Sequence, residues 1–142
     1  MTTLCLHENP QRRENKVVAR RSLIRGVEYE TDGHFEEVKN HDMACSVCQV
    51  QRSDVVMVPG RRTCPGGWVL EYEGMIMGAR ASLSAESNGS DFICVSIAFD
   101  TVPGGGNENT GANIYLTEIE CNSLPCPPYE AETELSCVVC SK

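Results

Sequence analysis

The sequence predicts an all-β fold held together by disulfide bonds, and three observations support this prediction. Short segments rich in valine, isoleucine and aromatic residues alternate with Gly and Pro clusters, a pattern typical of strands and turns. The 142 residues include nine cysteines, more than a reducing compartment usually tolerates outside metal sites. The chain also contains two unequal copies of one cysteine-containing unit, which predicts a tandem-duplicated module.

Matching segments define the two copies. Residues 4–6 resemble 93–95, residues 26–29 resemble 111–115, and residues 44–48 resemble 136–140. The lone cysteine precedes the final cysteine pair by 40 residues in the first copy and by 43 in the second. Nothing before Cys5 corresponds to residues 55–77. We therefore expect a truncated first subdomain, residues 1–48, and a complete second subdomain, residues 49–142.

Five segments have the composition and the alternation of strands. They are Val55–Val58, Trp68–Met77, Phe92–Phe99, Ile114–Ile119 and Leu135–Val139. The glycine-rich stretch 104–111 is predicted to be a flexible loop. Residues 12–25 are the one segment in which we expect a helix.

Composition limits how such a fold is stabilised and what it binds. Aromatic residues make up only 6% of the chain, so we expect cross-links to supplement a mainly aliphatic core. The net charge of −8 argues against nucleic acid, which needs clustered Lys and Arg. No apolar stretch approaches the ~20 residues that span a bilayer, so we expect no membrane partner.

The cysteines predict disulfides more strongly than metal ligation. The repeat allows one consistent scheme: Cys5–Cys45, Cys64–Cys140, Cys94–Cys137 and Cys121–Cys126. Cys48 is left over, because its partner would be the missing counterpart of Cys64, and we expect it to be a free or intermolecular thiol. Each bridge is expected to contribute about 2–4 kcal/mol.

Zinc is the alternative that the cysteine spacing leaves open. Cys45 with Cys48, and Cys137 with Cys140, form two Cys-x-x-Cys pairs that are able to supply four thiolates. The pairs stand 89 residues apart, far more than the ~15–20 residues of a compact zinc ribbon. Zinc would also leave the other cysteines unexplained, and a redox motif fits less well because the pair closes a unit and opens no helix.

Other polar residues form no recognisable catalytic or metal-binding pattern. His7, His34 and His41 are scattered, and no nucleophile stands with a base, so we expect no enzyme. The acidic residues Glu36, Glu37, Glu130, Glu132 and Glu134, and the loop residues Asn107, Glu108 and Asn109, have no calcium-loop spacing. We interpret them as exposed strand and turn residues and expect neither a metal nor a cofactor.

Two further features bear on an extracellular environment. Asn88-Gly89-Ser90 is an N-glycosylation sequon, which is used only in the secretory pathway. Trp68 and Tyr72 are able to line a sugar site, although core packing beside Cys64 is the simpler interpretation. Residues 1–5 lack the basic start and apolar run of a signal peptide, which we reconcile with the cysteine content by expecting that the front of the domain is absent.

Several phrases of the chain resemble a known family. They are 26–31 (GVEYET), 44–48 (ACSVC), 57–61 (MVPGR), 64–68 (CPGGW), 121–129 (CNSLPCPPY) and 135–142 (LSCVVCSK). They are similar to the C-terminal non-collagenous domain of short-chain, spongin-type collagens of marine invertebrates. The Cys-Pro-x-Gly-Trp block and the Cys-x-Val-Cys endings are more distantly similar to the non-collagenous domain of type IV collagen, a tandem duplication of β-rich subdomains whose bridges run first to sixth, second to fifth and third to fourth.

The resemblance implies a secreted, non-catalytic structural or assembly module of the extracellular matrix. Its partners would be other matrix chains, or further copies in a homo-oligomer. Because the chain has no Gly-X-Y tract, it cannot itself form a triple helix. Two alternatives stay open: a secreted lectin-like or cation-dependent recognition module, and an intracellular zinc-binding protein.

Overall fold

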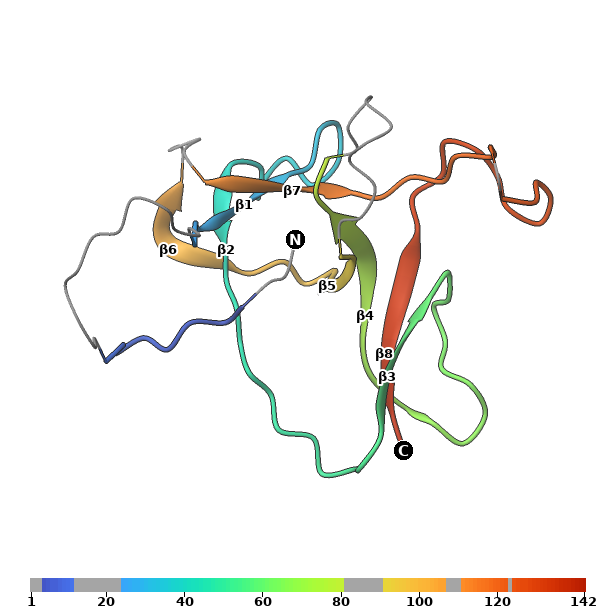
Figure 1. Cartoon of the computed structure of the whole chain (residues 1–142), viewed down its shortest axis with the longest axis horizontal. Coiled ribbons are helices and arrows are strands. Elements are labelled where there is room, and N and C mark those ends of the chain that lie inside the picture. Colours follow the sequence, from blue (N-terminus) through green and yellow to red (C-terminus); the bar gives the residue numbers. More distant parts are fainter. Residues whose placement is uncertain (1–3, 12–23, 81–90, 107–110, 123) are drawn as a thin grey trace, which may run out of the picture.

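Figure 1 shows the computed structural model, which describes residues 4–11, 24–80, 91–106, 111–122 and 124–142. Within these ranges the chain contains no helix, which confirms the prediction of an all-β fold. The strands are β1 (Val27–Glu30), β2 (His41–Met43), β3 (Val55–Pro59), β4 (Val69–Gly78), β5 (Ile93–Ser96), β6 (Thr101–Gly106), β7 (Ala112–Leu116) and β8 (Ser136–Ser141).

The strands form one sheet in the order β3-β8-β4-β7-β1-β2-β6, and β5 lies off this path as a further partner of β4, beside β8 and β7. Figure 1 shows two groups, β3, β8 and β4 on one side and β7, β1, β2 and β6 on the other. They join where the last residues of β4 pair with β7. Strands from both predicted subdomains therefore share one sheet, and the boundary at residue 48 stays a prediction.

The three-stranded group is an antiparallel ladder with β8 in the centre. All five residues of β3 pair with β8 without a register shift, and β4 pairs with the other edge of β8 with one bulge. Valine, isoleucine and tyrosine favour this pleated arrangement. Gly74 is required where β4 pairs with β5, because a Cβ at this position would lie 2.2 Å from the carbonyl oxygen of Val95.

The second group places matching segments of the two copies side by side. β1 and β7 pair in parallel, with Val27 opposite Ala112 and Tyr29 opposite Ile114. The sequence repeat matches the same two segments, 26–29 and 111–115. Since directly opposed residues of a parallel pair point to the same face, Tyr29 and Ile114 enter the core together.

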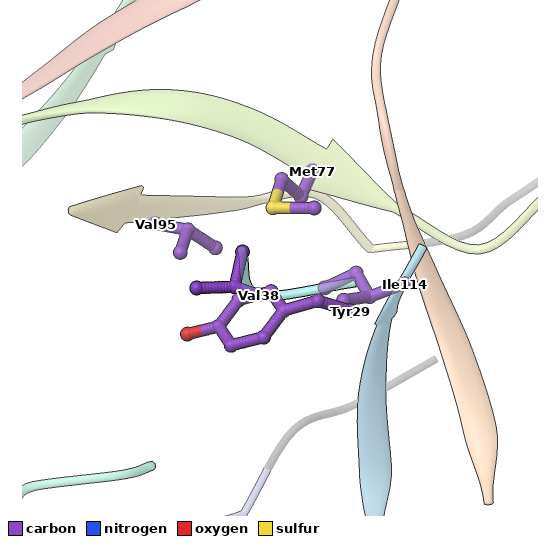
Figure 2. Packing of buried hydrophobic residues seen from close by; sticks show 5 residues of the cluster. All are labelled: Tyr29, Val38, Met77, Val95 and Ile114. Atoms are coloured by element: carbon purple, nitrogen blue, oxygen red, sulfur yellow. The ribbon is translucent and has the colours of Figure 1, made fainter. Parts of the chain in front are cut away.

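The core lies where the two groups of strands meet. Its buried cluster consists of Tyr29, Val38, Met77, Val95 and Ile114, drawn in Figure 2. Phe99 packs against its edge, with its ring centroid 5.4 Å from that of Tyr29 and 4.7 Å from that of Phe35. Each buried side chain of this size contributes about 1.5–3 kcal/mol, so this small cluster leaves a large share of the stabilisation to other interactions.

The predicted strands are confirmed with shifted ends, and three strands escaped prediction. Phe92–Phe99 shortens to β5, and Ile114–Ile119 begins and ends earlier as β7. β1 and β2 were missed because they are short, and β6 because it is rich in glycine. The prediction that 104–111 is a loop is wrong for 104–106, which belong to β6. There Gly105 lets β6 approach Asp42, whose Cβ would lie 2.8 Å from an added methyl group.

The remaining sequence predictions of this kind fall mostly on residues that the structure does not describe. Residues 12–23 of the expected helix lie outside the described ranges, and Ile24 and Arg25 precede β1 without helical structure. The loop residues Asn107, Glu108 and Asn109 and the sequon residue Asn88 also lie outside them.

Candidate functional site

The cysteines form four pairs at disulfide distance. The Cα–Cα distances are 5.6 Å for Cys5–Cys45 and 5.9 Å for each of Cys64–Cys140, Cys94–Cys137 and Cys121–Cys126. These values lie in the range of unstrained disulfides. The pairs are those of the scheme that the repeat allows. Cys137 and Cys140 are fully buried on β8. Because they are three residues apart, their side chains point to opposite faces, and a disulfide bond holds the central strand on each face.

This pairing separates the thiols that zinc would need. Cys45, Cys137 and Cys140 each lie in a different bridge. Among the described residues, no group of three or more His, Cys, Asp or Glu side chains is placed to hold a metal ion. A zinc site at the two Cys-x-x-Cys pairs would therefore require three bridges to be broken.

Cys48 is the one free cysteine, and all nine cysteines lie in described ranges. It is exposed and follows Val47, whose side chain is 88% exposed. Figure 1 draws residues 44–54 as a long connection without a strand between β2 and β3. Burial raises the pKa of the Tyr72 hydroxyl, and Cys48 adds to this shift.

A cavity of about 270 Å³ lies at the junction of the two copies. One bridge from each copy borders it, through Cys45 and Cys94, and its aromatic lining comes from Tyr29, Tyr72 and Phe99. Trp68 does not line it. Tyr72 therefore lies on an aromatic surface of the kind that a sugar site needs, and Trp68 does not lie on this surface.

The two tyrosine hydroxyl groups at the cavity are held by the backbone. The Tyr29 hydroxyl donates to the carbonyl oxygen of Asp100 at 3.1 Å, and that of Tyr72 donates to Cys94 at 2.9 Å. Burial raises the pKa of Tyr29, and the Asp100 carboxylate adds to this shift. Both hydroxyls are thus kept protonated and in fixed orientations, and they suit binding rather than acid–base chemistry.

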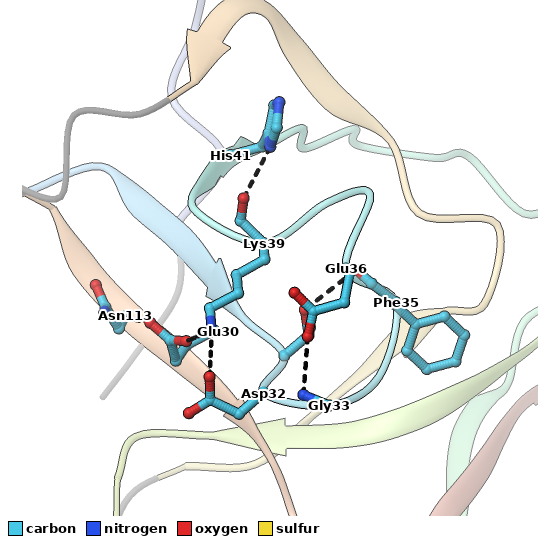
Figure 3. A network of polar contacts seen from close by, with 9 residues as sticks. Glu30, Asp32, Gly33, Phe35, Glu36, Lys39, His41 and Asn113 are labelled. Carbon is cyan, nitrogen blue, oxygen red and sulfur yellow. Dashed lines mark hydrogen bonds and ion pairs between the residues drawn. The ribbon is translucent and has the colours of Figure 1, made fainter.

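A polar network covers the turn between β1 and β2 (Figure 3). The Lys39 ammonium forms a close ion pair with Asp32 and lies 3.4 Å from a carboxylate oxygen of Glu30. The hydrogen bond from Lys39 holds the pKa of Asp32 below its usual value, and Asp32 raises the pKa of Lys39. Asn113 of β7 donates to Glu30 at 3.3 Å, so the network ties the first copy to the second.

The histidines and acidic pairs of the sequence are dispersed. His41 Nδ1 lies 3.0 Å from the carbonyl oxygen of Lys39, and His34 Nε2 lies 3.3 Å from a carboxylate oxygen of Glu134. His7 Nδ1 accepts the backbone N–H of Asn9 at 3.0 Å. Glu36 accepts the backbone N–H of Gly33 at 2.9 Å (Figure 3). The contacts of His7, His41 and Glu36 stabilise local turns, and that of His34 with Glu134 joins distant segments, so these side chains do not converge on a shared site.

The surface of the β3–β8–β4 ladder is the feature that sequence reasoning missed. Large apolar side chains of its outer strands stay exposed, namely Val55, Val56, Met57, Val69, Leu70 and Tyr72. The register places Val55, Met57, Val69 and Tyr72 on one face of the ladder and Val56 and Leu70 on the other. Exposed apolar groups gathered on one face are typical of interaction sites. The alternation in the sequence predicts strands, but it does not reveal that little of the described chain covers them.

One polar group closes the end of this ladder. Arg52 Nε donates to the Ser141 hydroxyl at 2.5 Å, and Arg52 Nη2 donates to Glu71 at 2.8 Å. The Ser141 hydroxyl in turn donates to Glu71. The hydrogen bond from Ser141, and then that from Arg52, lowers the pKa of Glu71. The carboxylate thus links β4, β8 and the segment that leads into β3.

The described part of the chain has no helix with the length and apolar character needed to cross a membrane. Its disulfides are compatible with an extracellular environment. Comparison with family models, with curated proteins and with solved structures finds no match to this chain.

Proposed function

We propose that the chain is a non-catalytic structural and assembly module of the extracellular matrix, of the short-chain collagen type, located outside the cell. The observation that carries this proposal is the combination of four bridges with an exposed apolar ladder. The bridges stabilise a small core in an oxidising environment. The apolar ladder supplies a surface for other matrix chains or for further copies.

The phrases shared with spongin-type collagens support the same proposal. The phrase Cys64–Trp68 forms the last part of the connection between β3 and β4, and the phrase Leu135–Lys142 contains β8. The Cys64–Cys140 bridge therefore joins the first phrase to the central strand of the ladder. In the proposed assembly module these residues hold the ladder in shape.

Deposition into matrix tests this proposal. The chain, secreted from cultured fibroblasts behind a heterologous signal peptide, is expected to enter the insoluble collagenous fraction. The matched control is Cys94→Ala with Cys137→Ala, which removes the bridge between β5 and β8 and is expected to leave the secreted chain soluble. Recovery of the unaltered, fully oxidised chain only from the soluble medium would refute the proposal.

A secreted recognition module is a second candidate, favoured by the aromatic lining of the cavity at the junction of the copies. Tyr72 presents its ring there, while its hydroxyl is held by Cys94. Stacking of a sugar ring on such a surface is common in recognition sites. A glycan array probed with the chain and with Tyr72→Ala tests this function. A signal that is lost in the variant supports it, and a blank array rejects it.

A further inference from the structure

The outer edge of β3 has no strand partner among the described residues, because β3 ends the strand order of the sheet. Toward β8, Asp54 and Lys142 exchange backbone hydrogen bonds of 3.2 and 3.0 Å, and the Gly60 N–H donates to Ser136 at 2.7 Å. Hydrogen-bonding direction alternates along an antiparallel strand. The N–H and C=O groups of Val55 and Met57 therefore point outward, away from β8.

Over residues 55–58 this edge lacks the charges and bulges by which proteins usually protect a terminal strand, and its one protective residue, Pro59, stands at its end. Residues 55–58 contain no charged side chain and no bulge, whereas protected edges carry inward charges, bulges or a covering segment. Val55 is 54% exposed and Met57 is 38% exposed. Pro59 stands at the end of the strand, where its missing N–H removes one outward donor and leaves its carbonyl oxygen available.

The two ends of the edge carry opposite charges. Asp54 precedes the strand, and Arg61 follows it. Neither forms an ion pair with another described residue, and the Arg61 guanidinium instead donates to the Thr63 hydroxyl at 3.2 Å. In an antiparallel copy of the same strand that is centred on Met57, Asp54 of one chain would lie opposite Gly60 of the other, one residue from Arg61, at both ends of the pair.

We propose that two copies of this chain associate through β3, paired antiparallel about a twofold axis at Met57. In this register the two Met57 residues exchange both backbone hydrogen bonds, and each Val55 N–H donates to Pro59 of the other copy. Pro59 has no N–H to donate to Val55 in return. Because Pro59 is the last residue of the paired strand, the absence of this hydrogen bond costs least there. The interface is isologous, so one surface supplies both halves, and strand addition joins the two sheets into one.

A second copy fits this edge better than an unrelated partner does. The pattern of outward donors and acceptors is self-complementary about Met57, and the pattern of charges is self-complementary to within one residue of the same point. The inference rests on the proposed assembly function, and it deepens that function by naming the surface and the partner.

Charge reversal tests the pairing without altering the strand itself. All variants are made on Cys48→Ser, so that the free thiol cannot link chains. Sedimentation equilibrium is expected to give about twice the 15.6 kDa of one chain. Asp54→Arg and Arg61→Asp are each expected to weaken dimerisation about tenfold, and the two together to restore it within about threefold. A monomer at every concentration tested, or single and double variants of equal effect, overturns the proposal.

Cross-linking tests the register. Residues that exchange both hydrogen bonds lie ~5.5 Å apart at their Cα atoms, within disulfide range. Met57→Cys on the Cys48→Ser background is therefore expected to form a covalent dimer in air. Val56→Cys, one residue away in the same strand, is the matched control and is expected to stay largely uncross-linked. Dimer formation by the Val56 variant alone overturns the proposed register.

The two proposals fail in different ways. A chain that is monomeric in solution but still enters the collagenous fraction would remove the β3 pairing and leave the matrix function in place. A chain that dimerises through β3 but stays soluble would do the opposite.

Discussion

Two nearly identical phrases of this chain adopt different structures. Ser136–Cys140 lies in β8, the central strand of the antiparallel ladder, with β3 on one edge and β4 on the other. Ala44–Cys48 shares its Cys-x-Val-Cys pattern and forms no strand. Val139, the equivalent of Val47, is half-buried between β3 and β4, opposite Met57 and Tyr72, whereas the side chain of Val47 is 88% exposed.

The difference shows that strand formation here depends on partners more than on local propensity. A strand is stable when neighbouring strands satisfy its backbone groups and cover its side chains. β8 finds both in the segments 55–59 and 69–78. The first copy has no counterpart of these segments within this chain, so its equivalent residues run as a connection.

The cysteines follow the same logic. Cys45 and Cys137 are equivalent, and each bonds the lone cysteine of its own copy. Cys140 bonds Cys64, which lies between β3 and β4. Cys48 is the equivalent of Cys140 and is free. Cys48 thus differs from Cys140 in having no counterpart of Cys64 within this sequence to bond.

The largest expected loss of stability comes from removing the Cys64–Cys140 bridge, which has no equivalent at Cys48 in the first copy. Cys64→Ala with Cys140→Ala opens a bridge of sequence separation 76, whereas Cys121→Ala with Cys126→Ala opens one of separation 5. Restriction of the unfolded chain grows with loop length, so we expect losses of about 4 and about 2 kcal/mol. Urea unfolding measures both, and equal losses would contradict the ranking.

The converse change should convert the first phrase into a strand. A second copy of residues 51–92 fused directly before Leu4 supplies the missing hairpin and a partner for Cys48. We expect the free thiol titre to fall from one per chain to none and the stability to rise by about 2–4 kcal/mol. The control fusion carries Cys64→Ser in the added copy and should keep its thiol. If the Cys48 thiol stayed reactive in the fusion that keeps Cys64 in the added copy, supplying the hairpin would not be enough to convert the first phrase into a strand.

Equivalent side chains should differ in their contribution to stability. Val139→Ala removes a half-buried side chain from the central strand and is expected to cost about 1 kcal/mol. Val47→Ala, in the matching phrase, is expected to change stability by no more than about 0.5 kcal/mol. Chemical denaturation of both variants measures the difference. A comparable loss at Val47 would mean that the connection is packed in solution.

The smallest effect concerns acid. The pKa of Glu71 is lowered from its ordinary 4.5 in the folded chain, so its stabilisation is present above that pH and is lost as the pH falls through the folded value. Glu71→Gln should therefore lower the melting temperature at pH 7 and flatten its fall below about pH 5. Glu130→Gln is the matched control on an exposed turn. An unchanged acid profile in the Glu71 variant would exclude this role of the carboxylate.

Much of the disulfide framework is readable from the repeat, because cysteine spacing survives where other residues have changed. The matching segments 26–29 and 111–115 even lie in register as β1 and β7. The cavity and the exposed ladder are not readable, since both depend on how segments far apart in the chain meet. β6 illustrates the same limit, because its glycines predict a loop and its strand structure depends on pairing with β2.

The sequence by itself determined the all-β class, the cysteine pairs and the unpaired thiol at Cys48, because alternation, turn residues and repeat spacing are local or countable properties. The tertiary structure alone decided which of two matching phrases became a strand, where the small core gathered and which edge of the sheet stayed open. These outcomes depend on hydrogen-bonding partners and covering side chains that come from distant parts of the chain, and no local pattern encodes them.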